Sequence, residues 1–237
     1  MKRKALLIAN TNGLQGTKKD LLKFSSFLKS DFGGVWFDEE IEQLYDPSLL
    51  GLYVKLNTLK KEGNDYTIVF FSGHGGQLRE TVLEINGNGD QINESELKGL
   101  SPRQLSIFDC CRAYPQHIQD SVTSEAYFSR AQKSINYHVR ELYSNRIMQA
   151  IPQQACLYSC SIGESSYDTA DGAVYFGNFL KSAMNTSPGY KLVGNAHIEA
   201  IPPTVEYSKN QKGGLQNPDS SLPKCLSQQQ LIISINQ

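Results

Sequence analysis

The sequence predicts an α/β protein with a mostly parallel central sheet and helices on both faces of that sheet. Two observations lead to this prediction. Short apolar runs bounded by turn residues alternate with longer segments of helical periodicity. The run at residues 66–71 is apolar throughout, as expected for a strand that is covered on both faces. Repeated alternation of strand and helix is typical of parallel sheets flanked by helices.

The first part of the chain predicts strands and helices in strict alternation. Short apolar runs indicate strands at residues 4–9, 41–45 and 66–71. Apolar residues recur at helical spacing over residues 17–28 and 49–61, which predicts a helix after each of the first two strands. These segments therefore follow the order strand, helix, strand, helix, strand.

The middle of the chain continues this pattern less regularly. Residues 81–92 favour a small hairpin around an Asn-Gly-Asn-Gly turn, and residues 94–99 favour a short helix. Apolar runs indicate further strands at residues 104–108 and 155–160. Residues 173–184 have the pattern of another helix.

Two parts of the chain depart from the alternation. Residues 114–124 favour a loop, and residues 125–150 favour a polar helical insertion. The last part of the chain is rich in Pro, Gly, Asn and Gln. It predicts a strand near residues 204–207 and ends in an apolar run at residues 231–235.

Composition and charge exclude several classes of protein. With 39% hydrophobic and 20% charged residues, the chain is expected to fold as an ordinary soluble globular protein. A formal net charge of −1 provides no general attraction to nucleic acid or to anionic membranes, so neither is an expected partner. The first residues lack the pattern of a signal peptide, and no apolar run is long enough for a transmembrane helix.

The cysteines predict a reduced, cytoplasmic protein. There are five of them, and their spacing lacks the pattern of a secreted disulfide framework. Cys156 and Cys160 could be interpreted as metal ligands, but no second pair of Cys or His residues matches them. We interpret both as small buried residues on a strand.

Reactive side chains follow two of the predicted strands. His74 lies in a glycine-rich turn after the third strand, and Cys110 and Cys111 follow the fourth. Each residue alone would also suit a purely structural position. Because the carboxyl ends of parallel strands meet at one edge of a sheet, we expect these residues to share a site. A cysteine nucleophile needs a nearby base, and histidine titrates nearest to physiological pH, so the pattern predicts a Cys-His catalytic pair.

Two segments at these positions resemble the signature segments of the caspase and metacaspase superfamily. Residues 70–75 (FFSGHG) are similar to its histidine segment, and residues 109–113 (DCCRA) to its nucleophile segment. Cys111 and Arg112 match the caspase pattern Gln-Ala-Cys-(Arg/Gln/Gly)-Gly. Asp109 departs from that pattern and instead matches the Asp-x-Cys of metacaspases and related prokaryotic proteins.

The resemblance covers most of the chain. Further similar segments lie at residues 14–20, 91–97, 172–180 and 214–218. The resemblance implies a single caspase-like peptidase domain over residues 1–237, folded as a three-layer αβα sandwich around a mostly parallel sheet of about six strands. The large-subunit part spans residues 1–113, a helical insertion spans about 114–150, and the small-subunit part spans 151–237.

The register of the resemblance selects Cys111 as the nucleophile and His74 as the general base. Aligning either the Asp-x-Cys motif or the arginine after the caspase nucleophile places Cys110 beside the nucleophile, on the opposite face of the strand. The resemblance also implies that the backbone N–H groups of Gly75 and Cys111 form the oxyanion hole.

The resemblance further predicts the residue that precedes the cleaved bond. Asp20 and Asp109 fall where metacaspases carry the carboxylates of the S1 pocket, which accepts Arg or Lys. Two carboxylates favour a cationic P1 side chain and reject an anionic one. The alternatives are an exposed helix carboxylate for Asp20 and a turn cap for Asp109.

Calcium and self-cleavage are two forms of regulation that the resemblance raises. Metacaspases often require calcium, but Glu80, Glu84 and Asp90 form no recognisable acidic cluster, so we expect no cofactor and no metal site. The insertion carries basic residues at which an Arg- or Lys-specific peptidase could cleave itself: Arg130, Lys133, Arg140 and Arg146. The alternative is that these side chains are solvated charges on a polar helix.

Taken together, the resemblance implies a cytoplasmic thiol protease that acts on a protein substrate. Compact domains of this kind resemble bacterial proteases of stress or antiviral defence, which cleave a separate protein such as a gasdermin-like pore former. An activating partner belongs to this expectation, and the oligomeric state is left open. One alternative is a catalytically silent scaffold. Another is a nucleotide-binding α/β protein, but residues 10–18 lack the GxxxxGK(S/T) order of a phosphate loop.

Overall fold

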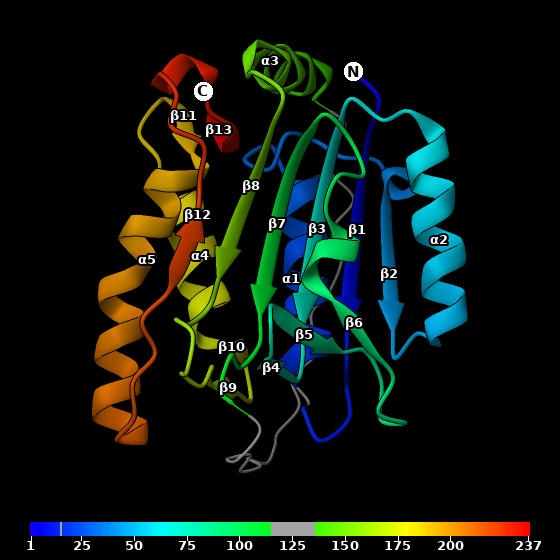
Figure 1. The fold of residues 1–237 in the computed structure, drawn as a ribbon. Helices are drawn as coiled ribbons and strands as arrows, with labels where there is room; N and C mark the ends of the chain where they lie inside the picture. The colour runs from blue at the N-terminus through cyan, green and yellow to red at the C-terminus, as the bar shows by residue number, and fades with distance from the viewer. Residues whose placement is uncertain (15, 115–135) are drawn as a thin grey trace.

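The computed structural model describes residues 1–14, 16–114 and 136–237, and its centre is a six-stranded sheet (Figure 1). The strand order is β12-β8-β7-β3-β1-β2. Neighbouring strands are parallel except β12, which runs antiparallel to β8 at one edge. The strands of this sheet are β1 (Arg3–Ala9), β2 (Ile41–Tyr45), β3 (Tyr66–Ser72), β7 (Arg103–Asp109), β8 (Gln153–Tyr158) and β12 (Asp219–Ser221).

The strand β3 lies in the interior of the sheet, between β1 and β7, and all of its residues are buried. Phe70 of β3 pairs with Leu7 on one side and with Ile107 on the other. A strand in this position needs apolar side chains on both faces, which explains the uninterrupted apolar run in the sequence.

Helices cover both faces of the sheet (Figure 1). On one face, α1 (Gly16–Lys29) and α4 (Val174–Met184) pack against alternate strand residues, with the ring of Phe70 5.4 Å from Phe24 and 4.1 Å from Phe176. On the other face, α2 (Leu49–Glu62) packs against the intervening strand residues, among them Leu6 and Ile8. The three-layer αβα sandwich with a mostly parallel sheet of six strands is therefore confirmed.

Smaller elements surround this frame. The helices α3 (Tyr137–Gln149) and α5 (Val193–Tyr207) lie on the same side as α1 and α4. Three small antiparallel sheets complete the described residues: β4 (Gly75–Gln77), β5 (Thr81–Glu84) and β6 (Gln91–Asn93); β9 (Asp168–Thr169) with β10 (Gly172–Ala173); and β11 (Gly189–Leu192) with β13 (Ile232–Asn236). The β4-β5-β6 sheet begins directly after His74 and therefore frames the histidine turn.

The predicted strand near residues 204–207 is wrong, because these residues form the last turn of α5. Pro202 and Pro203 argue against a helix, since proline lacks the N–H group that a helix interior uses. The buried side of α5 nevertheless has helical spacing: Val193, Ala196, His197, Ala200 and Thr204. Packing of this side against α4 stabilises the helix in spite of the prolines.

The predicted insertion at residues 114–150 is described only in part. Residues 115–135 lie outside the described residues, and the proposed cleavage points Arg130 and Lys133 are among them. The described remainder of the insertion consists mainly of α3.

The two other proposed cleavage points, Arg140 and Arg146, lie within α3. Arg140 donates to the Glu40 carboxylate at 2.6 and 2.8 Å, and its guanidinium lies 3.8 Å from the centre of the Phe37 ring. Arg146 is 6% exposed. Because a peptidase binds an accessible, extended chain, this fold protects both positions.

The cysteines of the chain are free thiols. Cys156 lies in β8 and Cys160 lies just after it, and both are buried as expected. Among the described helices, none combines the length and the apolar character needed to cross a bilayer.

Candidate active site

A cavity of about 860 Å³ opens at the carboxyl ends of β3 and β7. His74, Gly75, Asp109 and Cys111, which the sequence assigns to catalysis and substrate binding, all line it. The strand register explains why they meet, since Ser72 at the end of β3 pairs with Asp109 at the end of β7. Residues that follow two paired strand ends necessarily share one cleft.

The orientation of His74 is fixed by a backbone carbonyl. Its Nε2 atom lies 2.8 Å from the Asn12 oxygen, in the loop after β1. A carbonyl oxygen can only accept, so Nε2 carries the hydrogen. In the neutral ring, Nδ1 is then the atom that can accept a proton.

Gly75 begins β4 and lies against the segment that carries Cys110 and Cys111. A Cβ atom at this position would lie 2.8 Å from the Cys110 sulfur and 3.0 Å from the Cys111 backbone oxygen. Any side chain would therefore force the two segments apart, which explains the glycine. The close approach holds the Gly75 backbone beside that of Cys111, as an oxyanion hole with two backbone donors requires.

The Cys111 thiol is partly buried, and its hydrogen bonds involve the neighbouring residues Ser165 and Ser166. The Ser166 N–H donates to Sγ at 3.3 Å, and Sγ lies 3.6 Å from the Ser166 backbone oxygen. Burial raises the pKa of the Cys111 thiol, although the Ser166 N–H opposes this effect. The resting group is therefore a neutral thiol at pH 7, and a base must remove its proton before it can attack.

Cys110 has different surroundings from Cys111. Its side chain is 1% exposed and packs with Phe108 and Tyr158 in the core on the α2 side. Burial raises the pKa of the Cys110 thiol well above its usual range. Its backbone N–H donates to Ser159 at 3.2 Å, which ties the end of β7 to the end of β8. Cys110 therefore has the character of a structural residue.

Asp109 lies at the base of the cavity and accepts hydrogen bonds on both oxygens. The Ser166 hydroxyl donates to Oδ1 at 2.7 Å, and the Phe176 N–H at the start of α4 donates to Oδ2 at 3.0 Å. Burial raises the pKa of Asp109 to about 6 despite these donors. The carboxylate is therefore largely ionised at pH 7 and loses its charge in mildly acidic solution.

Asp20 lies one layer further from the cavity than Asp109. It accepts from the Ser72 hydroxyl at 2.8 Å and from the Ala173 N–H at 3.1 Å, and both of these residues line the cavity in front of it. Burial, followed by the nearby charges of Asp109 and Asp168, raises the pKa of Asp20 well above its usual range. The sequence placed Asp20 directly in the pocket, whereas the structure places it behind the wall.

Asp168 is a site residue that sequence reasoning missed. It lies in β9 and lines the cavity, and among the described residues its buried Oδ1 atom has no hydrogen-bond partner. Burial raises the pKa of Asp168, while the backbone N–H groups of Thr169 and Gly16 and, to a smaller extent, the nearby Lys212 and His74 oppose the rise. Its signal in the sequence was only that a carboxylate follows soon after β8, the strand that pairs with β7. An unpartnered buried oxygen of this kind favours a positively charged ligand.

The described residues contain no group of three or more His, Cys, Asp or Glu side chains that could hold a metal ion. Two of the calcium candidates after His74 accept from backbone N–H groups. Glu80 accepts from the Ser95 N–H at 2.9 Å, and Asp90 accepts from the Leu49 N–H at 3.3 Å. These carboxylates therefore cap the ends of neighbouring segments.

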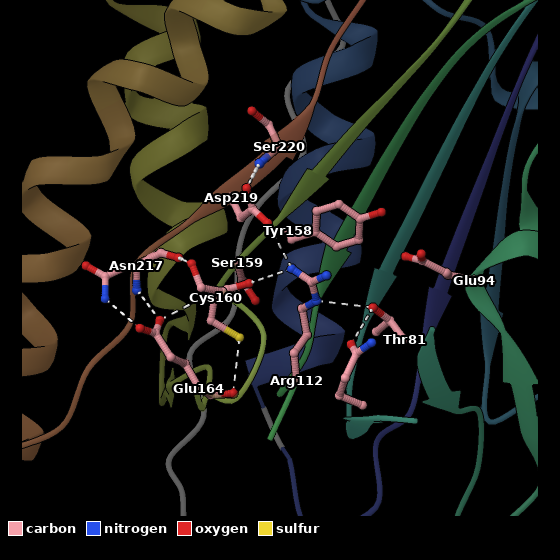
Figure 2. Close-up of polar contacts among 12 residues, drawn as sticks. Thr81, Glu94, Arg112, Tyr158, Ser159, Cys160, Glu164, Asn217, Asp219 and Ser220 are labelled. Carbon is pink, nitrogen blue, oxygen red and sulfur yellow. Dashed lines mark hydrogen bonds and ion pairs between the residues drawn. The ribbon is translucent and has the colours of Figure 1, made fainter. Parts of the chain in front are cut away.

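Arg112, the residue after Cys111, connects several segments (Figure 2). Its guanidinium donates to Thr81 of β5 and to the Cys160 carbonyl at 3.1 Å each, and to the Asp219 carboxylate of β12 at 3.3 Å. It also lies 4.0 Å from the centre of the Tyr158 ring. In the sequence, Arg112 indicates only the register of the nucleophile segment, because its partners come from distant parts of the chain.

Comparison with known proteins adds one match. The family described as the caspase domain has a model that matches residues 2–219 of the chain. No curated protein matches the chain. The match covers residues 70–75 and 109–113 and all of the central sheet except most of β12.

Proposed function

Because the chain belongs to the caspase domain family, we propose that it is a cysteine endopeptidase that cleaves protein substrates with Cys111 and His74. One observation carries this proposal. His74, with its Nε2 hydrogen directed at the Asn12 carbonyl, lines the same cavity as the Cys111 thiol. A histidine held in this tautomer is prepared to accept the thiol proton at Nδ1.

The geometry supports a two-step acyl transfer. His74 Nδ1 takes the thiol proton, and the Cys111 sulfur attacks the scissile carbonyl carbon, whose oxygen becomes an oxyanion. The N–H groups of Gly75 and Cys111 donate to this oxyanion, each contributing about 10²–10³ in rate. The imidazolium then protonates the leaving amine as the C–N bond breaks. Water, deprotonated by the neutral imidazole, hydrolyses the thioester and restores the thiol.

We propose Arg or Lys as the P1 residue, on the basis of the carboxylates at the base of the cavity. Asp109 and Asp168 line the cavity, and Asp20 lies behind the cavity wall, bonded to Ser72 and Ala173. A guanidinium or ammonium group would find a partner in the unpaired Asp168 oxygen and would favour ionisation of Asp109. An acidic P1 side chain would bring a further negative charge into the same place.

The biological setting that we propose is a cytoplasmic defence or cell-death effector. In this setting the enzyme cleaves a separate protein, such as a gasdermin-like pore former, after an activating partner has engaged it. Its chemistry needs no cofactor, because the thiol, the imidazole and the backbone donors supply every step of the reaction.

A catalytically silent scaffold is the second candidate. The observation that favours it is the contact of the Cys111 thiol with Ser166, which occupies the sulfur in the resting structure. A scaffold would keep this contact permanently, whereas an enzyme must release it when substrate binds.

Hydrolysis of fluorogenic peptides with Arg, Lys, Asp or Leu at P1 tests the proposal. Wild type and Cys110→Ala are expected to cleave after Arg or Lys, and Cys111→Ala and His74→Ala are expected to be inactive. Each is assayed with and without calcium. Cleavage after Asp or Leu would contradict the proposed pocket but preserve the peptidase. Absence of all cleavage, together with absence of covalent labelling at Cys111, would favour the scaffold.

A further inference from the structure

The turn at residues 214–218 lies against the loop that contacts the nucleophile, although the proposed mechanism gives it no role. Gln216 in this turn is 0% exposed. Its side-chain nitrogen lies 3.1 Å from the Ser159 backbone oxygen and 3.1 Å from the Ser166 hydroxyl oxygen. The buried Gln216 amide can therefore influence the groups that Ser159 and Ser166 contact.

These contacts fix the direction of a hydrogen-bond chain. The Ser159 oxygen can only accept, so the atom that faces it is the amide nitrogen of Gln216. The same nitrogen donates to the Ser166 hydroxyl oxygen. The hydroxyl hydrogen of Ser166 is thereby directed to Asp109 Oδ1, which lies 2.7 Å away. Gln216 thus determines that Ser166 acts as a donor toward the carboxylate at the base of the cavity.

Ser166 also contacts the nucleophile through its backbone. Its N–H donates to the Cys111 sulfur at 3.3 Å, and its carbonyl oxygen lies 3.6 Å from that sulfur. One residue therefore contacts both the S1 carboxylate and the reacting sulfur. Any displacement of Ser166 would therefore change its contacts with Asp109 and with the Cys111 sulfur at the same time.

The rest of the turn is anchored without touching Ser166. The Glu164 carboxylate accepts from the Asn217 backbone N–H at 2.7 Å and from its side-chain amide at 2.6 Å (Figure 2). The Ser161 hydroxyl donates to the Asn217 backbone oxygen at 2.9 Å. These bonds hold the turn on the loop at a point removed from Asp109. A variant at Asn217 therefore serves as a matched control for a variant at Gln216.

We propose that Gln216 is a positioning residue that holds Ser166 in the orientation that serves both the P1-binding carboxylate of Asp109 and the Cys111 thiol. The proposal rests on the peptidase function proposed above. It assigns a role in substrate recognition and nucleophile reactivity to a residue that touches neither the substrate nor the reacting atoms.

The proposal predicts how the pH dependence of kcat/KM changes when Gln216 is replaced. The titratable groups that face Asp109 are Asp20 of α1, Asp168 of β9, the adjacent Cys110 and Cys111, Cys160 after β8, and Tyr175 of α4. Removal of the Gln216 amide takes a donor from the Ser166 hydroxyl and from the Ser159 carbonyl, and the side chains of both serines donate to Asp109. When Ser166 no longer donates to Asp109, the ionised carboxylate loses a hydrogen bond and its pKa rises further. The acid limb of kcat/KM for a P1 Arg substrate therefore moves to higher pH.

The test compares Gln216→Met, Ser166→Ala, Ser166→Thr and Asn217→Ala with wild type, after thermal melting shows that each variant is folded. With a P1 Arg peptide, Gln216→Met and Ser166→Ala are expected to raise KM about tenfold. They are also expected to move the acid limb of the kcat/KM profile to higher pH, by about one pH unit. Ser166→Thr retains the hydroxyl and is expected to restore the profile. Asn217→Ala is expected to leave it unchanged.

The second readout is the pH dependence of iodoacetamide alkylation at Cys111, followed by peptide mass spectrometry. Its midpoint is expected to rise in Gln216→Met but not in Asn217→Ala, because only the former releases the Ser166 N–H from the sulfur. This readout needs no peptidase activity. If wild type cleaves no peptide but the midpoint shifts, the peptidase function fails and the positioning role stands. If the midpoint is unchanged in Gln216→Met, or moves equally in Asn217→Ala, the positioning role is overturned.

Discussion

The guanidinium of Arg112, the residue next to the proposed nucleophile, lies 4.0 Å from the centre of the Tyr158 ring. Its nitrogens donate to Thr81, to the Cys160 carbonyl and to Asp219, so β5, the loop after β8, and β12 all depend on this side chain. A planar guanidinium can stack and donate in several directions at once, which an ammonium group cannot.

Arg112→Met is expected to lower the free energy of unfolding by about 2–4 kcal/mol, because it leaves buried acceptors without a donor. Arg112→Lys is expected to recover less than half of this loss, since it restores neither the stacking nor the fork of donors. Urea denaturation measures both. Arg79→Met is the control, because Arg79 is exposed. An equal loss in Arg112→Met and Arg79→Met would contradict the role of Arg112.

His74→Gln is expected to lower kcat by about 10²–10⁴, because glutamine cannot take the thiol proton. His138→Gln, which changes an exposed histidine of α3, is expected to have no effect. Both are measured by steady-state hydrolysis of a P1 Arg peptide. A similar kcat in wild type and His74→Gln would show that another group acts as base.

Asp168→Asn is expected to lower kcat/KM for a P1 Arg peptide about tenfold to a hundredfold, because it removes a charged acceptor from the cavity. Asp171→Asn changes a carboxylate of the adjoining turn that is 86% exposed in its side chain, and is expected to have little effect. The measurement is the ratio of kcat/KM for P1 Arg to that for P1 citrulline, its neutral counterpart. If this ratio is the same in wild type and Asp168→Asn, Asp168 does not bind the P1 charge.

The pKa of Asp109, raised to about 6, predicts a preference for cations that depends on pH. As pH falls through 6, Asp109 is protonated and its attraction for the P1 charge disappears. The same ratio of P1 Arg to P1 citrulline hydrolysis is therefore expected to fall below pH 6, and the effect of pH on the general base cancels in the ratio. A ratio that stays constant between pH 5 and 8 would contradict the assignment of Asp109 to the S1 pocket.

Asp109 also predicts the pH dependence of stability. Its folded-state pKa of about 6 lies above the ordinary value of 3.8, so its contribution to stability is fully present below pH 3.8 and is lost as pH rises through 6. Relative to wild type, Asp109→Asn is therefore expected to gain up to about 3 kcal/mol between pH 4 and pH 8. Urea denaturation at the two pH values measures the difference, and a gain in the opposite direction would exclude the raised pKa.

The sequence predicted the central strands well because burial on both faces leaves an unmistakable apolar run, as in β3. It failed at α5, where Pro202 and Pro203 hid a helix that tertiary packing stabilises. It brought together the residues that follow β3 and β7, because paired strand ends are a local consequence of topology. It missed Asp168 and Gln216, whose places depend on how distant loops pack against the cavity. That packing leaves no local pattern in the sequence.

The central claim is that Cys111 is a nucleophile served by His74 in a pocket for cationic side chains. Intact-mass analysis after incubation with an acyloxymethyl ketone that carries a P1 Arg tests it most directly, since labelling needs no physiological substrate. The account predicts one adduct per chain, mapped to Cys111, retained in Cys110→Ala, lost in Cys111→Ala and slowed in His74→Gln. Labelling at Cys110, or the same labelling rate with a P1 Asp analogue, would contradict it.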